Sequence, residues 1–121
     1  MAQTYTILSQ TVHGVPSGNY DGSSQDWASD PVEAADYYRN RGSSTQTVTI
    51  DVADFVGSIV IEASLDTESD QATWFELTRF GDSETPITDR RPETILGNFV
   101  WLRARVELFE AGTINFITAT Y

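Results

Sequence analysis

Apart from its carboxylates, this 121-residue sequence has few side chains that could carry chemistry. His13 is the one histidine and cysteine is absent, so the residues needed for a zinc site or a Ser-His-Asp triad are missing. The sequence also lacks a nucleophile elbow, a P-loop and a dinucleotide-binding glycine motif. We therefore predict a protein that is not an enzyme and that needs no cofactor.

Carboxylates are the exception, because the sequence has 18 acidic residues. Asp66, Glu68 and Asp70 offer oxygen ligands at alternate positions, as calcium loops do, but the glycine and closing glutamate of an EF-hand are absent. We interpret this stretch as a solvated acidic loop and keep calcium as the weaker alternative. Paired carboxylates could also serve glycoside hydrolysis, but with this many acidic residues pairs arise by chance.

The charge balance limits which kinds of partner the protein can bind. Seven arginines and no lysine leave a net charge of −11, which repels phosphate backbones and anionic membrane surfaces. We expect neither nucleic acid nor a membrane as a partner. No apolar run approaches the ~20 residues that span a bilayer, and the first ten residues do not resemble a secretory signal.

Four aromatic residues lie in sequence rich in turn formers: Tyr20, Trp27, Tyr37 and Tyr38. If exposed, they could stack on sugar rings; if buried, they would close one end of a β-fold or pack against a partner subunit. We favour burial. A carbohydrate-binding module that recognises host surface glycans is the alternative.

The elements that must position these residues are strands. Residues 45–65 alternate apolar and polar side chains with many β-branched residues, which is typical of half-buried antiparallel strands. We expect two strands here, joined by a tight turn at 53–57 with Phe55 beneath it. Gly57 would take an unusual backbone angle in that turn.

Residues 99–108 form the second strong pattern. Val100, Leu102, Ala104 and Val106 share one face, while Trp101, Arg103 and Arg105 share the other with Phe99. We expect that second face to be an interface or to lie under long side chains. A turn at 110–112 would lead to a last strand at 113–121.

Other strands are predicted at 4–12, at 74–80 with Phe75 and Leu77 facing the core, and at 91–96. Residues 13–45 are predicted to be a long loop. A short helix could start there, with Asp30 as N-cap, Pro31 at N1 and Glu33 closing a capping box. The whole chain, residues 1–121, is predicted to be one all-β domain, an antiparallel β-sandwich of jelly-roll or immunoglobulin type.

The ordered set of these segments resembles a known family. It runs from the Tyr37-Tyr38 pair through TQTVTI (45–50), FVGSIVIEASL (55–65) and Trp74-Phe75 to GNFVWLRARV (97–106) and AGTI (111–114). This resembles a small β-sandwich module of virion structural proteins from contractile-tailed phages of the cyanophage and marine type. The family often has Gly-Phe after the tyrosine pair, where this chain has Arg-Asn-Arg.

The resemblance implies a non-enzymatic bacteriophage structural protein located in the virion, as a fibre, tail, baseplate, neck or capsid-decoration component. The implied partners are other virion proteins and further copies of the chain, with a trimer as the expected homo-oligomer. Arginine and aromatic residues are favoured interface anchors. The interface candidates are therefore Trp101, Arg103, Arg105, Tyr37, Tyr38 and Trp27.

Overall fold

The computed structural model describes residues 4–34, 45–66, 68, 73–81, 84–97 and 99–121. All regular structure in these ranges is β-strand, which confirms the all-β prediction. No helix occurs in the described ranges, and hence none there that could cross a membrane.

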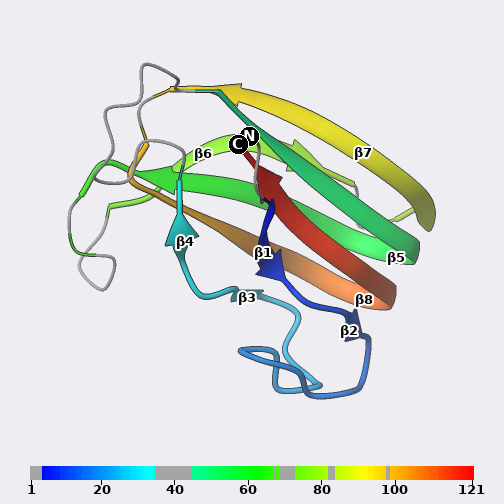
Figure 1. Ribbon diagram of the computed structural model, residues 1–121. Coiled ribbons are helices and arrows are strands. Elements are labelled where there is room, and N and C mark those ends of the chain that lie inside the picture. The colour runs from blue at the N-terminus through cyan, green and yellow to red at the C-terminus, as the bar shows by residue number, and fades with distance from the viewer. Residues whose placement is uncertain (1–3, 35–44, 67, 69–72, 82–83, 98) are drawn as a thin grey trace.

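The strands form one antiparallel eight-stranded sheet (Figure 1). Two long strands at its centre, β5 (Thr45–Ser64) and β8 (Trp101–Thr120), pair along almost their whole length. The other edge of β8 pairs in turn with β1 (Thr4–Leu8), β2 (Thr11–Val12), β3 (Trp27–Ala28) and β4 (Val32–Glu33). The other edge of β5 pairs with β6 (Phe75–Phe80) and β7 (Ile87–Leu96).

The predicted turns at 53–57 and 110–112 are wrong, because the chain continues through both as strand. The signals that indicated turns mark bulges instead. The β5–β8 register shifts between Asp51 and Ser58, and the positive backbone angles at Asp54 (φ 51°), Gly57 (φ 148°) and Gly112 (φ 91°) lie in this region. A bulge adds an unpaired residue and bends the strand without ending it.

We call this bent region the corner, and its glycines bring backbones unusually close together. A Cβ on Gly112 would lie 2.2 Å from the Asp54 carbonyl oxygen, and one on Gly81 would lie 2.7 Å from the Gly57 carbonyl oxygen. No side chain fits at these distances. The glycines are therefore needed both for the backbone angle and for the close approach of strands. Phe55 is fully buried at the corner, as predicted.

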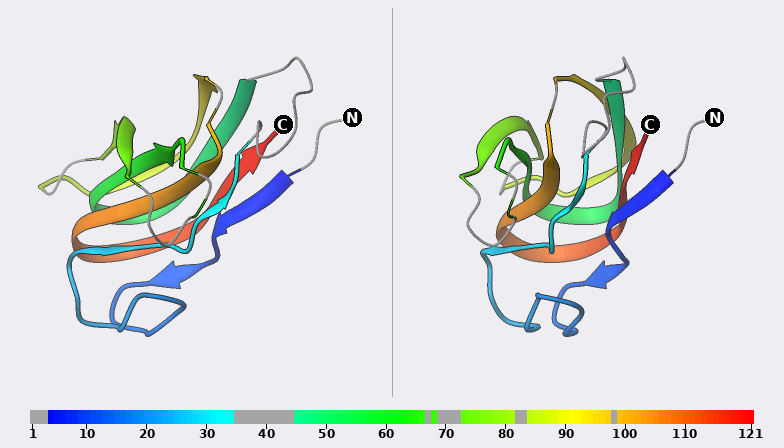
Figure 2. Two further views of the ribbon diagram at one scale, coloured as in Figure 1. Left: turned by 90° about the vertical axis from the view of Figure 1, so that its left-hand side faces the viewer. Right: turned by 60° about the vertical axis from the view of Figure 1, so that its left-hand side comes forward.

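Figure 2 shows that β5 and β8 curve strongly, so that the sheet turns back toward itself. The β7 half of the sheet contains β1, β7 and residues 45–52 of β5 and 113–120 of β8. The β6 half contains β3, β4, β6 and residues 58–64 of β5 and 101–107 of β8. Apolar side chains of both halves form one core cluster, including Ile50 and Ile117 from one half and Ile61 and Leu102 from the other. The structure thus has one bent sheet where the sequence predicted a sandwich of separate sheets.

Three local predictions are corrected. The long loop at 13–45 contains β3, β4 and a bridge between Ser17 and Tyr20. The helix predicted to start at Asp30 is absent from its described part, because Val32–Glu33 pairs with β8; the remainder, 35–44, lies outside the described residues. Phe75 is 45% exposed and does not face the core, whereas Leu77 packs partly against it.

Candidate functional site

The outer surface of the β6 half carries a ladder of charged side chains. Antiparallel pairing sets Arg103 opposite Glu62, and it places Val60 between Arg105 on β8 and Arg79 on β6. Side chains alternate between the two faces of a strand, so these residues point away from the core, where Ile61 and Ala104 lie. Three strands thus contribute charges to one surface.

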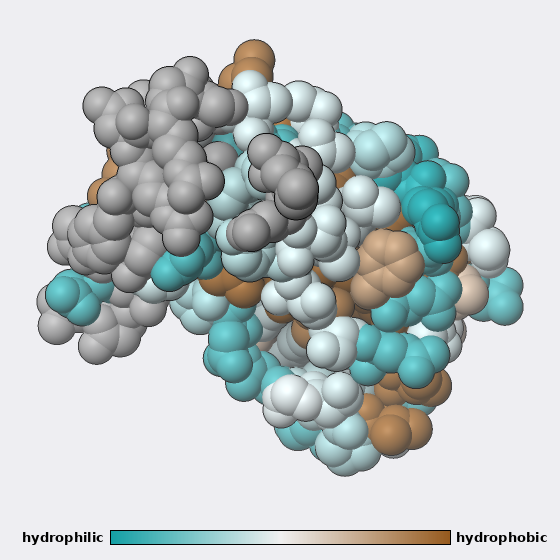
Figure 3. Space-filling model, viewed as in Figure 1, coloured by the Kyte–Doolittle hydropathy of each residue, from teal (hydrophilic) through white to brown (hydrophobic). Residues whose placement is uncertain are grey.

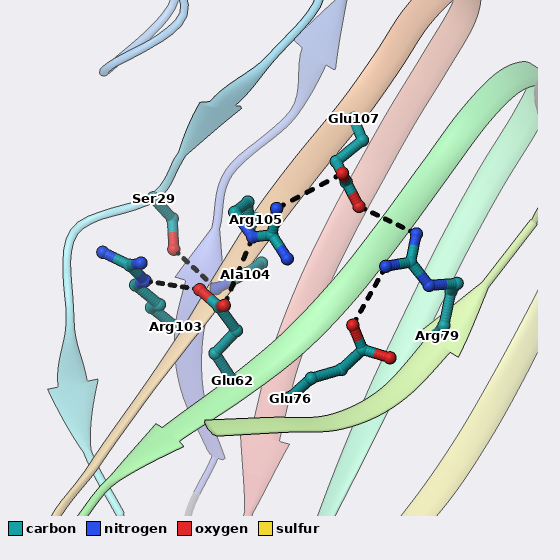
Figure 4. Close-up of polar contacts among 8 residues, drawn as sticks. All are labelled: Ser29, Glu62, Glu76, Arg79, Arg103, Ala104, Arg105 and Glu107. Atoms are coloured by element: carbon teal, nitrogen blue, oxygen red, sulfur yellow. Dashed lines mark hydrogen bonds and ion pairs between the residues drawn. The ribbon is translucent and has the colours of Figure 1, made fainter. Parts of the chain in front are cut away.

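The ladder is continuous across those strands (Figure 4). The Glu62 carboxylate accepts from Arg103 Nε at 2.8 Å and from Arg105 Nε at 3.2 Å. Glu107 pairs with Arg105 at 3.3 Å and with Arg79 at 2.8 Å, and Arg79 also pairs with Glu76 at 2.9 Å. Three arginines and three glutamates thus make a neutral, linked set.

Burial distinguishes the centre of the ladder from its ends. The Glu62 side chain is 8% exposed, while those of Arg79 and Glu76 are 44% and 46% exposed. Val60 is fully buried although it lies outside the core cluster, so the aliphatic stems of its neighbours cover it. Hydrogen bonds to Glu76 and then Glu107 raise the pKa of the Arg79 guanidinium above its ordinary value.

Aromatic side chains adjoin the ladder. Arg103 lies over the ring of Trp74, with 4.3 Å between the guanidinium carbon and the ring centroid. Trp101 pairs with Ser64 and is half-buried. Phe75 and Leu65, at this end of the sheet, are 45% and 57% exposed. We call Trp74, Trp101 and the six charged residues the ladder face.

The predicted interface residues are only partly brought together. Trp101, Arg103 and Arg105 lie on the ladder face, but Trp27 lies in the core, 9% exposed. The Trp27 ring contacts Tyr20 and Phe109, with centroid distances of 5.2 and 6.2 Å. Tyr20 is also buried, so the predicted burial of these two aromatics is confirmed. Tyr37 and Tyr38 lie outside the described residues.

In the acidic stretch that was considered as a calcium loop, the described residue Asp66 makes local hydrogen bonds. Asp66 accepts a hydrogen bond from the Thr73 backbone at 2.5 Å and one from the Ser64 hydroxyl at 3.3 Å. Glu68 is described, whereas Asp70 is not. Among the described residues, no group of three histidine or acidic side chains is placed to hold a metal ion.

A recess of about 240 Å³ lies beside β1, next to the Ser17–Tyr20 bridge and the segment that joins β3 to β4. Asn19 Nδ2 donates to the Ala28 carbonyl and to Asp30 Oδ1, both at 3.0 Å. Thr6 and Ser9 also line it, together with the apolar residues Ile7, Leu8 and Val32. The recess is therefore of mixed polarity and has one carboxylate.

Reasoning from sequence missed four of the six charged residues of the ladder: Glu62, Glu76, Arg79 and Glu107. The alternation in 45–65 places Glu62 on the outer face of its strand. The pairing of Glu62 with Arg103 and Arg105, however, depends on the register between two strands about 40 residues apart, and no local pattern specifies that register.

No protein-family model matches the chain, and no curated protein or solved structure is significantly similar to it.

Proposed function

We propose that the protein is a non-enzymatic structural component of a phage virion that acts through protein–protein contacts. The observation that carries this proposal is the ladder face. Its six charged side chains are bound to one another across three strands, with Trp74 and Trp101 beside them. Arginine and tryptophan are enriched at the centres of interfaces, and side chains already held in place lose little freedom on binding.

The assignment to a virion rests on the resemblance of residues 37–121 to virion modules. On this proposal the chain belongs to a fibre, tail, baseplate, neck or capsid decoration and contacts other virion proteins. The sandwich architecture belongs to the same proposal: the two halves of the bent sheet, which share one core, take the place of its two layers.

A binding assay on assembled particles tests the proposal. The labelled chain should co-sediment with particles or tails from which it is missing, and Trp101→Ala and Arg105→Ala should weaken that binding by roughly tenfold or more. Val15→Ala changes a side chain that is 54% exposed and far from the ladder in the fold, so it serves as the control. Thermal unfolding confirms that each variant is folded. A chain with no affinity for particles under any condition would contradict the proposal.

A carbohydrate-binding module is the second candidate, and the recess beside β1 is the observation that favours it. The recess offers hydroxyls, an amide and the Asp30 carboxylate, which suit the hydroxyl groups of a neutral sugar. Stacking of sugar rings on Tyr20 and Trp27, the alternative to their predicted burial, is not supported, because both side chains are buried. Amide shifts of residues 6–9 and 29–32 on titration with neutral glycans, lost in Asp30→Ala, would favour this function. A flat response would remove it.

A further inference from the structure

The outer surface of the β7 half is an array of threonines. Thr4, Thr120, Thr47 and Thr94 are successive cross-strand partners on β1, β8, β5 and β7. A second row runs from Thr6 through Thr118 and Thr49 to Pro92. We call these seven threonines the threonine face. Figure 3, which views this side, shows a pale central area between hydrophilic and hydrophobic residues.

The array is regular because the spacing of strands in a sheet, and of residues along each strand, is regular. Neighbouring strands lie about 4.8 Å apart, and every second residue along a strand repeats after about 6.8 Å. The hydroxyls of Thr4 and Thr120 lie 3.0 Å apart, and those of Thr47 and Thr94 lie 3.4 Å apart. Each threonine carries a methyl group and a hydroxyl, so the surface is partly apolar and able to donate and accept hydrogen bonds.

The threonine face contains no charged residue in its two rows, although the chain carries a net charge of −11. Two identical molecules of that charge repel each other, and the repulsion is smallest when the surfaces that meet are neutral. Asp51, at the next position, is paired with Arg90 at 2.6 Å and so adds little net charge beside the face.

The sheet edge next to this face is poorly suited to pairing. β7 is an edge strand, and its middle carries Arg90, Arg91 and Pro92. Charged side chains and proline are the devices that keep edge strands from adding a further strand. A second copy therefore has a neutral, regular face available to it, beside an edge that resists strand addition.

We propose that the threonine face is the surface through which two copies of this chain pair face to face. This inference rests on the proposed function in protein–protein contacts. It adds that one partner is a second copy of the chain and that the threonine face is the surface used. The face covers roughly 260 Å² per copy, because it has eight positions of about 4.8 by 6.8 Å each. This is about a third of the ~800 Å² per partner in a standard interface. The pairing is therefore weak in solution and is strengthened where an assembly holds many copies together.

Sedimentation equilibrium of the purified chain at rising concentration tests the pairing. Thr49→Glu places a carboxylate at the centre of the face, where two copies would bring like charges together, and weakens dimerisation roughly tenfold or more. Gln25→Glu adds the same charge at an exposed side chain outside the face and leaves dimerisation nearly unchanged. Thermal unfolding shows whether each variant remains folded, and Thr94→Glu on the exposed edge strand gives a second test of the face.

Ionic strength provides a separate test. Salt screens the repulsion between two negative molecules, so pairing through a neutral face strengthens between about 0.05 and 0.5 M NaCl. A dimer held by ion pairs between the two copies would weaken over the same range. A monomer at millimolar concentration, a trimer, a dimer that Thr49→Glu leaves intact, or a dimer that salt weakens would each overturn the inference. Loss of particle binding with intact dimerisation would instead contradict the proposed function alone.

Discussion

At the scale of single residues, Glu62 is the side chain on which the ladder face depends most. Its carboxylate is almost fully buried and accepts from two arginines that belong to the adjacent strand. A buried carboxylate is tolerated only when its hydrogen bonds are satisfied, and here Arg103 and Arg105 satisfy it. The two arginines in turn depend on Glu62, because their side chains are only 25% and 34% exposed.

Glu62→Gln should therefore destabilise the protein by about 1–3 kcal/mol, since two partly buried guanidinium groups lose their counter-charge. Glu76→Gln, at the exposed end of the same ladder, should cost less than about 1 kcal/mol. Urea unfolding followed by tryptophan fluorescence measures both. Equal costs for the two variants would show that burial does not determine the contribution of these ion pairs.

Asp21 predicts a dependence on pH. Its carboxylate accepts hydrogen bonds from the backbone N–H groups of Ser23 and Ser24 and from the Ser24 hydroxyl, which lower its pKa from 3.8 to about 2. The unfolded chain thus binds this proton more readily than the folded chain. The stabilisation is complete above pH 4 and is lost as the pH falls toward 2.

The carboxyl carbon of Asp21 should therefore titrate near pH 2 in an NMR titration of the folded protein. Asp21→Asn should also make the midpoint of urea unfolding less sensitive to pH between about 4 and 2. A titration midpoint near 4 would mean that the turn at 21–24 does not hold the carboxylate as described.

At the scale of elements, the corner determines how the long strands are arranged. Gly112→Ala should destabilise strongly, by more than about 3 kcal/mol, because its Cβ would clash with the Asp54 carbonyl and its φ is positive. Gly18→Ala is the matched control, since its φ is also positive (57°) but nothing lies within 4 Å of the added atom. It should cost only about 1–2 kcal/mol. If chemical unfolding gave similar losses of stability for Gly112→Ala and Gly18→Ala, the close approach of the backbones at Gly112 would not explain its effect.

The sequence predicted the apolar faces of the strands well, because alternation is a local signal. Leu102, Ala104 and Val106 are fully buried, as expected. It did not predict that strands continue through 53–57 and 110–112, because a glycine with positive φ marks a turn and a bulge alike. The outcome depends on whether a neighbouring strand pairs on both sides of the glycine, and only the fold provides that neighbour. The ladder partners were missed for the same reason.

At the scale of the whole molecule, stability should be concentrated in the central pair. Every other strand pairs with β5 or β8 at one edge. Hydrogen exchange should therefore be slowest for amides of β5 and β8, and faster for β1, β3 and β4, which are short and lie at an edge. Protection of the N-terminal strands equal to that of β5 would contradict this order.

The net charge of −11 also acts on the molecule as a whole, because it keeps separate copies apart except where neutral surfaces meet. The ladder face and the threonine face are both neutral, and they lie on opposite halves of one bent sheet. A molecule with two such faces can contact two different neighbours, which is what a repeating assembly requires.

The proposal that the chain is a virion component that acts through these faces is tested most directly by electron cryo-microscopy of the assembled phage particle. The account predicts density for the bent sheet at repeated positions, with the ladder face or the threonine face against a neighbouring subunit. A particle that lacks the chain, or one in which both faces lie open to solvent, would contradict it.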